Sequence, residues 1–316
     1  IGSAFGAGLS DVKSRVLPAV YKSSGGLTQK VEVSVKHEGN PVSLTIQLGD
    51  QRQKERLQPG ENTFYVEVPA VESAKALPLT LTAGKEQQQA TVQFAPVRHW
   101  QVNFVQHTHT DIGYTRSQME ILQEQLRYID YALDYCDLTD DYPEAAQFRW
   151  TCETAWAVSE YLKCRPAAQI ERLKQRVKEE RIELATMYLN FDELPDEQTL
   201  AASLAPLKQF RDLGMRAELA MQDDVNGIGW CFSEFFADAG VKYVNMGTHG
   251  HRALICFDQP TLFWWQSPSG KKVLTYRAEH YHYGNFLGIE KDDFESFEQK
   301  VLNYLGELEA KRYPYD

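Results

Sequence analysis

Two histidines and an aspartate follow a short apolar segment in the stretch 107–115, which reads HTHTDIGYT. The residues just before it, WQVNFVQ, carry Trp, Val and Phe at alternating positions, a pattern that predicts a strand over 100–106. Side chains two positions apart on a strand share a face, so His107, His109 and Asp111 begin on the same side. Imidazole and carboxylate groups at a strand end suit a divalent cation, although a polar strand end with a capping histidine contains the same residue types.

A third metal ligand is expected from a later strand. The apolar run 217–221 is followed by Gln-Asp-Asp and then by the turn 225–227, which reads VNG. Asp224 is the best candidate because it leaves the strand directly before that turn, and Asp223 is the competing choice. Either aspartate could instead cap the helix that follows.

The elements that must position these residues follow a β–α alternation from residue 98 onward. Predicted strands alternate with predicted helices, which indicates a parallel sheet or an α/β barrel. Polar clusters repeatedly follow the strands at their carboxyl ends, the rim at which α/β barrels hold their active sites. These clusters are at 107–111, 192–193, 223–224, 249–251 and 279–282. No glycine-rich phosphate-binding motif follows the first strand, so nothing favours a nucleotide ligand.

Periodicity assigns the individual elements of this region. Helices are predicted over 118–135, 155–163, 167–179, 200–210, 233–239 and 294–310. Strands are predicted over 148–150, 182–186, 217–221, 241–246, 263–266 and 272–277, the last two as a hairpin.

The first third of the chain has a different pattern. Residues 28–94 contain short alternating runs separated by Gly, Pro, Asn and Asp, which predicts an antiparallel β-sandwich over 27–97. Before it, apolar residues at every fourth position in 9–22 predict a short helix, and 1–26 is expected to be a helical segment with a linker. The sandwich contains no titratable cluster, so a packing or spacer role is favoured over a carbohydrate-binding module.

Composition bounds the possible partners. The 316 residues predict about two domains, and 33 basic against 44 acidic residues give a net charge of −11. This acidity argues against a nucleic-acid partner, which requires a basic surface. No apolar run is long enough to cross a membrane. The five cysteines include no CxxC pair, and a first residue other than methionine leads us to expect a processed, periplasmic or secreted protein.

Several blocks of the sequence resemble glycoside hydrolase family 38, the retaining α-mannosidases. HTHTDIGYT resembles the HxHxDxGW/Y signature, and FRWTCE, IELATMYLNFDE and QDDVNGIGWCFSEFFADAGVKY resemble later blocks in the same order. The resemblance covers about 98–290, and the bacterial branch with an N-terminal β-sandwich fits the arrangement. It implies a (β/α)7-type barrel as the catalytic domain, over 98–316.

The resemblance also implies a metal centre. The ligands would be His109, Asp111 and Asp224, holding Zn²⁺ or, as alternatives, Co²⁺ or Ca²⁺. Asp224 would also be the nucleophile, because the family's spacing to the glycine before the next strand, here Gly240, selects Asp224. His107 would lie behind the ligands and orient one of them.

The implied substrate is an α-mannoside or a mannose-containing glycan. Tyr114 matches an aromatic residue that stacks on the sugar ring, and Asn226, His249 and Tyr281 match positions near sugar-contacting residues. Retaining hydrolysis needs a nucleophile and an acid/base about 5–5.5 Å apart. The metal would bind the 2- and 3-hydroxyls of mannose.

One departure from the family concerns the end of the chain. The family's acid/base aspartate and its fourth ligand, a histidine, follow the point that matches 314–316. The chain is therefore expected to be an N-terminal fragment with weak metal binding and little turnover. The alternative is that Glu279, His280 and His282 have taken over these roles.

Two other functions are compatible with these residues. An amidohydrolase-type metal enzyme also begins with HxH at a strand end, and would use both His107 and His109 with histidines from 249–251 and 280–282. A non-catalytic sugar-binding protein on the same scaffold would lack the acid/base.

Overall fold

The computed structural model describes residues 8–191, 195–225, 227–250 and 257–315. The chain divides into two compact units, of which the first comprises 1–102 with 291–316 and the second comprises 103–290. The last segment of the chain thus groups with the β-rich part, whereas the sequence placed it in the domain 98–316.

The helix predicted over 9–22 is wrong, because Gly8–Ser23 forms strand β1 and pairs antiparallel with β2 (Gly26–Glu38). The valines at every fourth position lie on a strand whose register shifts twice, once between Val16 and Val20. Pro18 lies within this second irregularity, where its missing N–H breaks no regular ladder. The predicted linker is a tight turn that joins the two strands.

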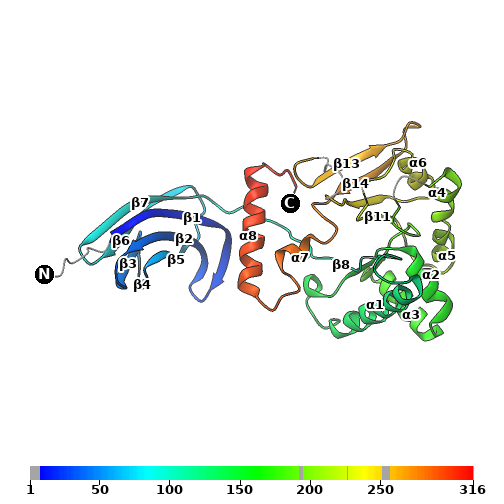
Figure 1. The fold of residues 1–316 in the computed structure, drawn as a ribbon, viewed down its shortest axis with the longest axis horizontal. Coiled ribbons are helices and arrows are strands. Elements are labelled where there is room, and N and C mark those ends of the chain that lie inside the picture. Colours follow the sequence, from blue (N-terminus) through cyan, green and yellow to red (C-terminus); the bar gives the residue numbers. More distant parts are fainter. Residues whose placement is uncertain (1–7, 192–194, 226, 251–256, 316) are drawn as a thin grey trace. The chain divides into compact units, whose positions relative to one another are not determined.

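Two antiparallel sheets make up most of the first unit (Figure 1). Their remaining strands are β3 (Val42–Leu48), β4 (Gln51–Leu57), β5 (Gly60–Pro69), β6 (Lys75–Ala83) and β7 (Glu86–Phe94). The sheet orders are β1-β2-β5 and β4-β3-β6-β7. Alternate side chains of both sheets enter one apolar core, which includes Val31 and Val33 from β2 and Leu44 and Ile46 from β3. The antiparallel region predicted from the alternating runs is confirmed, and it begins at β1.

Strand β4 was not predicted, since its sequence QRQKERL lacks apolar alternation. It forms because its backbone pairs with β3 along its whole length, from Gln51 opposite Leu48 to Leu57 opposite Val42. The turn between β4 and β5 therefore comprises only residues 58–59.

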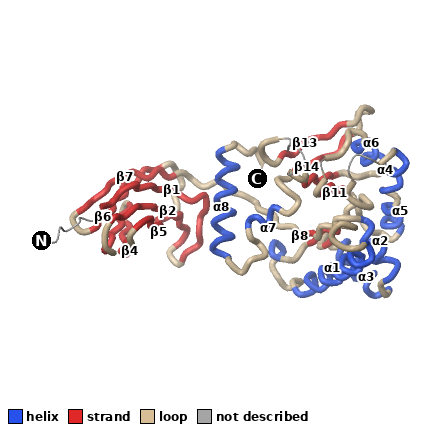
Figure 2. The backbone as a smooth tube through the Cα atoms, viewed as in Figure 1, coloured by secondary structure: helices blue, strands red, loops and turns tan. Residues whose placement is uncertain are grey.

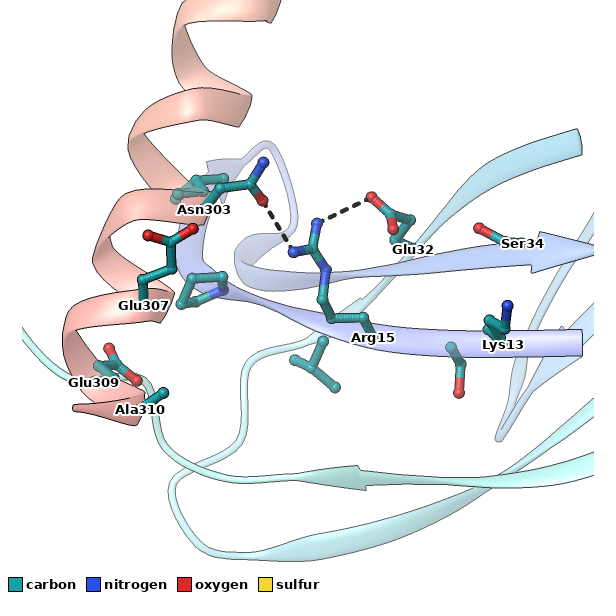
Figure 3. A pocket seen from close by; sticks show the side chains of 13 residues that line it. Lys13, Arg15, Glu32, Ser34, Asn303, Glu307, Glu309 and Ala310 are labelled. Atoms are coloured by element: carbon teal, nitrogen blue, oxygen red, sulfur yellow. Dashed lines mark hydrogen bonds and ion pairs between the residues drawn. The ribbon is translucent and has the colours of Figure 1, made fainter. Parts of the chain in front are cut away.

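Helix α8 (Phe294–Ala310) matches its predicted bounds and belongs to the first unit. The guanidinium of Arg15 on β1 donates to Oδ1 of Asn303 at 2.9 Å and to Oε2 of Glu32 at 3.2 Å. Figure 3 shows these contacts beside a groove of about 790 Å³ between β1 and α8. The groove is lined largely by polar and charged side chains, and it includes none of the predicted site residues.

The second unit alternates strands and helices, as predicted from residue 98 onward. Its strands are β8 (Gln106–His107), β9 (Trp150–Cys152), β10 (Ile182–Leu184), β11 (Leu219–Asp223), β12 (Tyr243–Gly247), β13 (Thr261–Gln266) and β14 (Lys272–Arg277). Its helices are α1 (Gln118–Leu138), η1 (Glu144–Ala146), α2 (Ala155–Cys164), α3 (Ala167–Lys178), α4 (Glu197–Ser203), α5 (Pro206–Asp212), α6 (Phe232–Asp238) and α7 (Tyr283–Leu287). Figure 2 shows this alternation of helix and strand.

The strands of the second unit form two sheets with parallel pairing. One has the order β10-β9-β8, and the other the order β11-β12-β14-β13, in which only the hairpin β13–β14 is antiparallel. A parallel bridge from Ala185 to Leu219 links the first sheet to the second. Within the described residues no ladder joins β8 to β13 or β14, so a closed barrel is not seen among them.

The strand predicted over 100–106 is reduced to Gln106–His107. Upstream, Trp100 belongs to the first unit, where its indole N–H donates to Glu309 at 2.9 Å and its ring stacks on Tyr313. Val102 and Phe104 are 44% and 39% exposed, so the alternation in this segment does not mark one buried strand face.

Helices and strands of the second unit share one apolar core. The helix predicted over 118–135 is confirmed as α1, which buries Leu126, Ile129 and Leu133 almost fully. None of the described helices has the length and apolar character needed to cross a membrane.

The two-sheet core predicts a large stability loss when one of its central side chains is shortened. Leu44 is completely buried, so we expect Leu44→Ala to lower the free energy of unfolding by about 2–5 kcal/mol. Leu27 is 57% exposed, and Leu27→Ala should change the free energy of unfolding by less than about 0.5 kcal/mol. Urea unfolding of both variants tests this, and equal losses would contradict the assigned core.

Candidate metal centre

His107 and His109 share one carboxylate. Nδ1 of His107 lies 2.8 Å from Oε2 of Glu153, and Nδ1 of His109 lies 2.9 Å from Oε1 of the same group. The parallel pairing of β8 with β9 explains this arrangement. His107 is level with Thr151 in the ladder, and two residues further His109 comes beside Glu153.

The Glu153 carboxylate is fully buried and receives two further hydrogen bonds. The side-chain amide of Asn190 donates to Oε1 at 2.6 Å, and the backbone N–H of Thr110 donates to the same atom at 3.3 Å. Glu153 and Asn190 were not predicted as site residues. Glu153 could have been found from its position, because it is the acidic residue that ends FRWTCE and directly follows a strand.

The second nitrogen of His109 faces two carboxylates. Nε2 lies 3.2 Å from Oδ1 of Asp111 and 3.4 Å from Oδ2 of Asp224. These side chains are partly exposed, so the group is open to solvent. The structure thus brings together the predicted set His109, Asp111 and Asp224.

Asp223 and Asp224 face different surroundings although they are neighbours. Strand β11 ends at Asp223, whose side chain is completely buried and accepts a bond from the N–H of Gly247 at 3.1 Å. Asp224 has a φ of +57°, a left-handed conformation that turns the chain and aims its carboxylate at His109. Its own N–H donates to the carbonyl of Gly247 at 3.0 Å.

Gly247 is required at this position for a steric reason. A Cβ there would lie 2.6 Å from Oδ1 of Asp223 and 2.6 Å from Cβ of Tyr281. Any side chain would therefore displace both the aspartate segment and the segment that follows β14.

Two of the predicted sugar-contacting residues lie beside these groups. Nε2 of His249 is 3.4 Å from Oδ1 of Asp224. The ring of Tyr281 lies 4.6 Å from the ring of His109, and its carbonyl accepts a bond from Nε2 of His107 at 2.6 Å.

The other two predicted contacts are Tyr114 and Asn226. Tyr114 is 78% exposed. Asn226 lies outside the described residues. His251 and the polar cluster predicted at 192–193 lie outside them too.

Buried charges shift several pKa values in this region. Burial alone would lower the pKa of His109, but the hydrogen bond and charge of Glu153, with Asp111 and Asp224, raise it to about 9. Burial raises the pKa of Glu153, and the hydrogen bonds from both histidines overcome this and lower it to about 2. Burial and the charge of Glu153 raise the pKa of Asp223 to about 7.

The set His109, Asp111 and Asp224 fits a divalent cation. Metal–ligand bonds near 2.1 Å place neighbouring ligand atoms about 3.0–3.4 Å apart in octahedral or tetrahedral geometry. The distances of 3.2 and 3.4 Å from Nε2 of His109 fall in that range. Oδ1 of Asp224 is buried next to Nε2 of His249, at 3.4 Å, and accepts no hydrogen bond within the described residues.

A second three-residue group, His107, Glu153 and Asp223, does not fit a metal. The distance of 2.8 Å between His107 Nδ1 and Glu153 Oε2 is that of a hydrogen bond, and Nε2 of His107 is bonded to the Tyr281 carbonyl. This group is a hydrogen-bonded support behind the first.

Comparison with protein families matches residues 99–315 to the N-terminal domain of glycosyl hydrolases family 38. The chain belongs to this family. The resemblance seen in HTHTDIGYT and the later blocks is thereby confirmed, and the His/Asp group described above is the candidate metal site of a family 38 domain.

Two solved structures are similar to this chain. An alpha-mannosidase from Enterococcus faecalis V583 has a TM-score of 0.52 at 19% identity, covering 65% of this chain and 23% of that one. A protein in glycosyl hydrolase family 38 from Enterococcus faecalis has a TM-score of 0.48 at 16% identity, covering 68% and 22%. The first shows a shared fold, and the chain spans less than a quarter of the length of either. A comparison with curated proteins finds no match.

The raised pKa of His109 predicts that metal binding depends on pH. Because this pKa is about 9, the ring carries a proton at pH 7 that a metal on Nε2 must displace. We expect the apparent Zn²⁺ affinity to rise about tenfold per pH unit between roughly pH 6 and 8, with about one proton released. Calorimetry in buffers of different ionisation enthalpy measures both, and an affinity independent of pH would contradict the assignment.

The metal assignment also predicts the effect of removing one anionic ligand. Asp224→Asn keeps the size of the side chain, and asparagine tolerates the left-handed backbone. We expect at least about tenfold weaker Zn²⁺ binding with an unchanged melting temperature of the metal-free chain. Asp141→Asn, at an exposed aspartate after α1, should bind as the unmodified chain does. Equal affinities in all three proteins would exclude Asp224 as a ligand.

Proposed function

We propose that this chain carries the metal site and the nucleophile of a retaining α-mannosidase. The observation that supports this most directly is the meeting of His109 Nε2 with Asp111 and Asp224 at 3.2 and 3.4 Å, at strand ends of a family 38 domain. A carbohydrate substrate follows from the family, and the restriction to α-mannosides is our proposal.

His109, Asp111 and Asp224 would hold the cation, which we propose to be Zn²⁺, with Co²⁺ or Ca²⁺ as alternatives. When bound, it supplies positive charge to neighbouring hydroxyls of the sugar and to the developing transition state. The mixed set of one imidazole and two carboxylates is compatible with all three ions, so a competition measurement is needed to rank them.

Asp224 can use its two oxygens for different purposes. Oδ2 faces His109 and would serve the metal, whereas Oδ1 accepts no hydrogen bond within the described residues. Attack of Oδ1 on the anomeric carbon would form a covalent glycosyl ester and expel the leaving group, as retaining hydrolysis requires. The backbone bond from Asp224 to Gly247 holds this carboxylate in place during the reaction.

Aromatic and imidazole groups around Asp224 would orient the sugar. The Tyr281 ring lies beside His109, and the His249 ring lies beside Asp224. The exposed Tyr114 would stack on the sugar ring, and Asn226 would contact it. His107 would orient the site from behind, through Glu153 and the Tyr281 carbonyl.

We also propose that the strand order β8-β9-β10-β11-β12-β14-β13 belongs to a (β/α)7-type barrel. Support comes from the parallel bridge between Ala185 and Leu219, which connects the two sheets. It comes also from the bond between His107, on the outermost strand β8, and Tyr281, which follows β14.

The amidohydrolase alternative would need both His107 and His109 as ligands of one centre. Both ring nitrogens of His107 are engaged, one by Glu153 and one by the Tyr281 carbonyl. This geometry favours a supporting role for His107 and therefore the mannosidase.

The proposed nucleophile can be tested without relying on a general acid. Fluoride leaves without being protonated, and a fluorine at C5 slows breakdown of the ester by destabilising the oxocarbenium-like transition state. We expect 5-fluoro-α-mannosyl fluoride with Zn²⁺ to add one fluorohexosyl group to the chain, mapped to Asp224 by peptide mass spectrometry.

Two variants serve as controls for this labelling experiment. Asp141→Asn should be labelled and Asp224→Asn should not. Label on another carboxylate would overturn the assignment of Asp224. Mannose binding without any label would favour the non-catalytic sugar-binding alternative.

A further inference from the structure

We infer that Glu153 is the positioning residue of this site, and that it couples the metal ligand His109 to the sugar-facing ring of Tyr281. The inference rests on the proposed function, because it concerns how that site is held. Glu153 touches neither metal nor sugar in this proposal, and it acts through the two histidines.

The first effect of Glu153 is on His109. An ionised carboxylate oxygen can only accept, so His109 must donate from Nδ1 to Oε1 at 2.9 Å. Once the ring loses its other proton, Nε2 is the only ring nitrogen with a lone pair for a metal, and it points toward Asp111 and Asp224. Without this bond the ring could rotate and present either nitrogen.

The second effect of Glu153 is on Tyr281. Its Oε2 accepts from Nδ1 of His107, whose Nε2 donates to the Tyr281 carbonyl at 2.6 Å. This chain fixes the backbone that carries the Tyr281 ring against His109. One carboxylate therefore sets both the ligand and the aromatic face beside it.

The carboxylate itself is held rigidly. Its side chain has no exposed surface, and the Asn190 amide and the Thr110 N–H both donate to Oε1. These partners come from the segments after β10 and β8, while Glu153 follows β9. Each of the three strands of this sheet thus contributes to the support at its carboxyl end.

The test compares Glu153→Gln with the unmodified chain. The amide keeps the shape but removes the negative charge and replaces one acceptor oxygen by a donor. The histidine facing that donor must lose its bond or give up its Nδ1 proton. We expect Zn²⁺ affinity to fall about 10–100-fold, a size typical of residues that orient metal ligands. The Co²⁺ absorption spectrum should also change, which a general loss of stability would not cause.

A matched control separates positioning from stability. Ser203 is buried and bonds the Leu200 carbonyl, without contacting either histidine. Ser203→Ala should lower the melting temperature and leave Zn²⁺ affinity and the Co²⁺ spectrum unchanged. If Glu153→Gln does not fold, Asn190→Ala takes its place, since it keeps the carboxylate and removes one of its donors.

The outcomes distinguish this inference from the proposed function. A folded Glu153→Gln chain with unchanged affinity and spectrum would overturn the positioning role and leave the metal site standing. If the unmodified chain binds no Zn²⁺ or Co²⁺, the proposed metal site fails. In that case ¹⁵N spectra of the imidazoles decide, because loss of the hydrogen-bonded Nδ1–H signals in Glu153→Gln supports the inference and identical spectra overturn it.

Discussion

The candidate site depends on a buried carboxylate that two imidazoles share. Burying an unpaired carboxylate is costly, and Glu153 is stabilised only because His107, His109, Asn190 and the Thr110 N–H all donate to it. The same bonds leave His109 with a single nitrogen directed at Asp111 and Asp224. The hydrogen bond from His109 to Glu153 therefore both stabilises the buried charge and orients the metal ligand.

The backbone at the end of β11 imposes a second constraint. The left-handed conformation of Asp224 separates it from Asp223, so that one aspartate lies partly exposed beside His109 and the other is completely buried. Gly247 accepts from one and donates to the other, and it leaves no room for a side chain. Strain of this kind persists where surrounding structure enforces it and is common at functional sites. In this chain the strained backbone places Oδ1 of Asp224, which accepts no hydrogen bond within the described residues, close to the proposed metal site.

Much of the fold and of the site follows from local sequence patterns. Alternation in the β2 and β3 segments predicts strands because one face of each is buried, and the stripe on α1 predicts its helix for the same reason. Sequence patterns fail where backbone pairing with a neighbouring strand, and not a buried apolar face, determines the secondary structure. Strand β4 has no apolar face, and β1 carries valines at a helical spacing, yet both form because a neighbouring strand satisfies their backbone.

By itself, the sequence determined which residue types could bind a cation. His109, Asp111 and Asp224 follow strands, and strand ends in parallel α/β proteins converge on one rim. Only the tertiary structure decided how they are held. The role of Glu153 depends on the register of β8 on β9, and the difference between Asp223 and Asp224 depends on a single backbone rotation. Both are properties of contacts between segments distant in sequence, which no local pattern encodes.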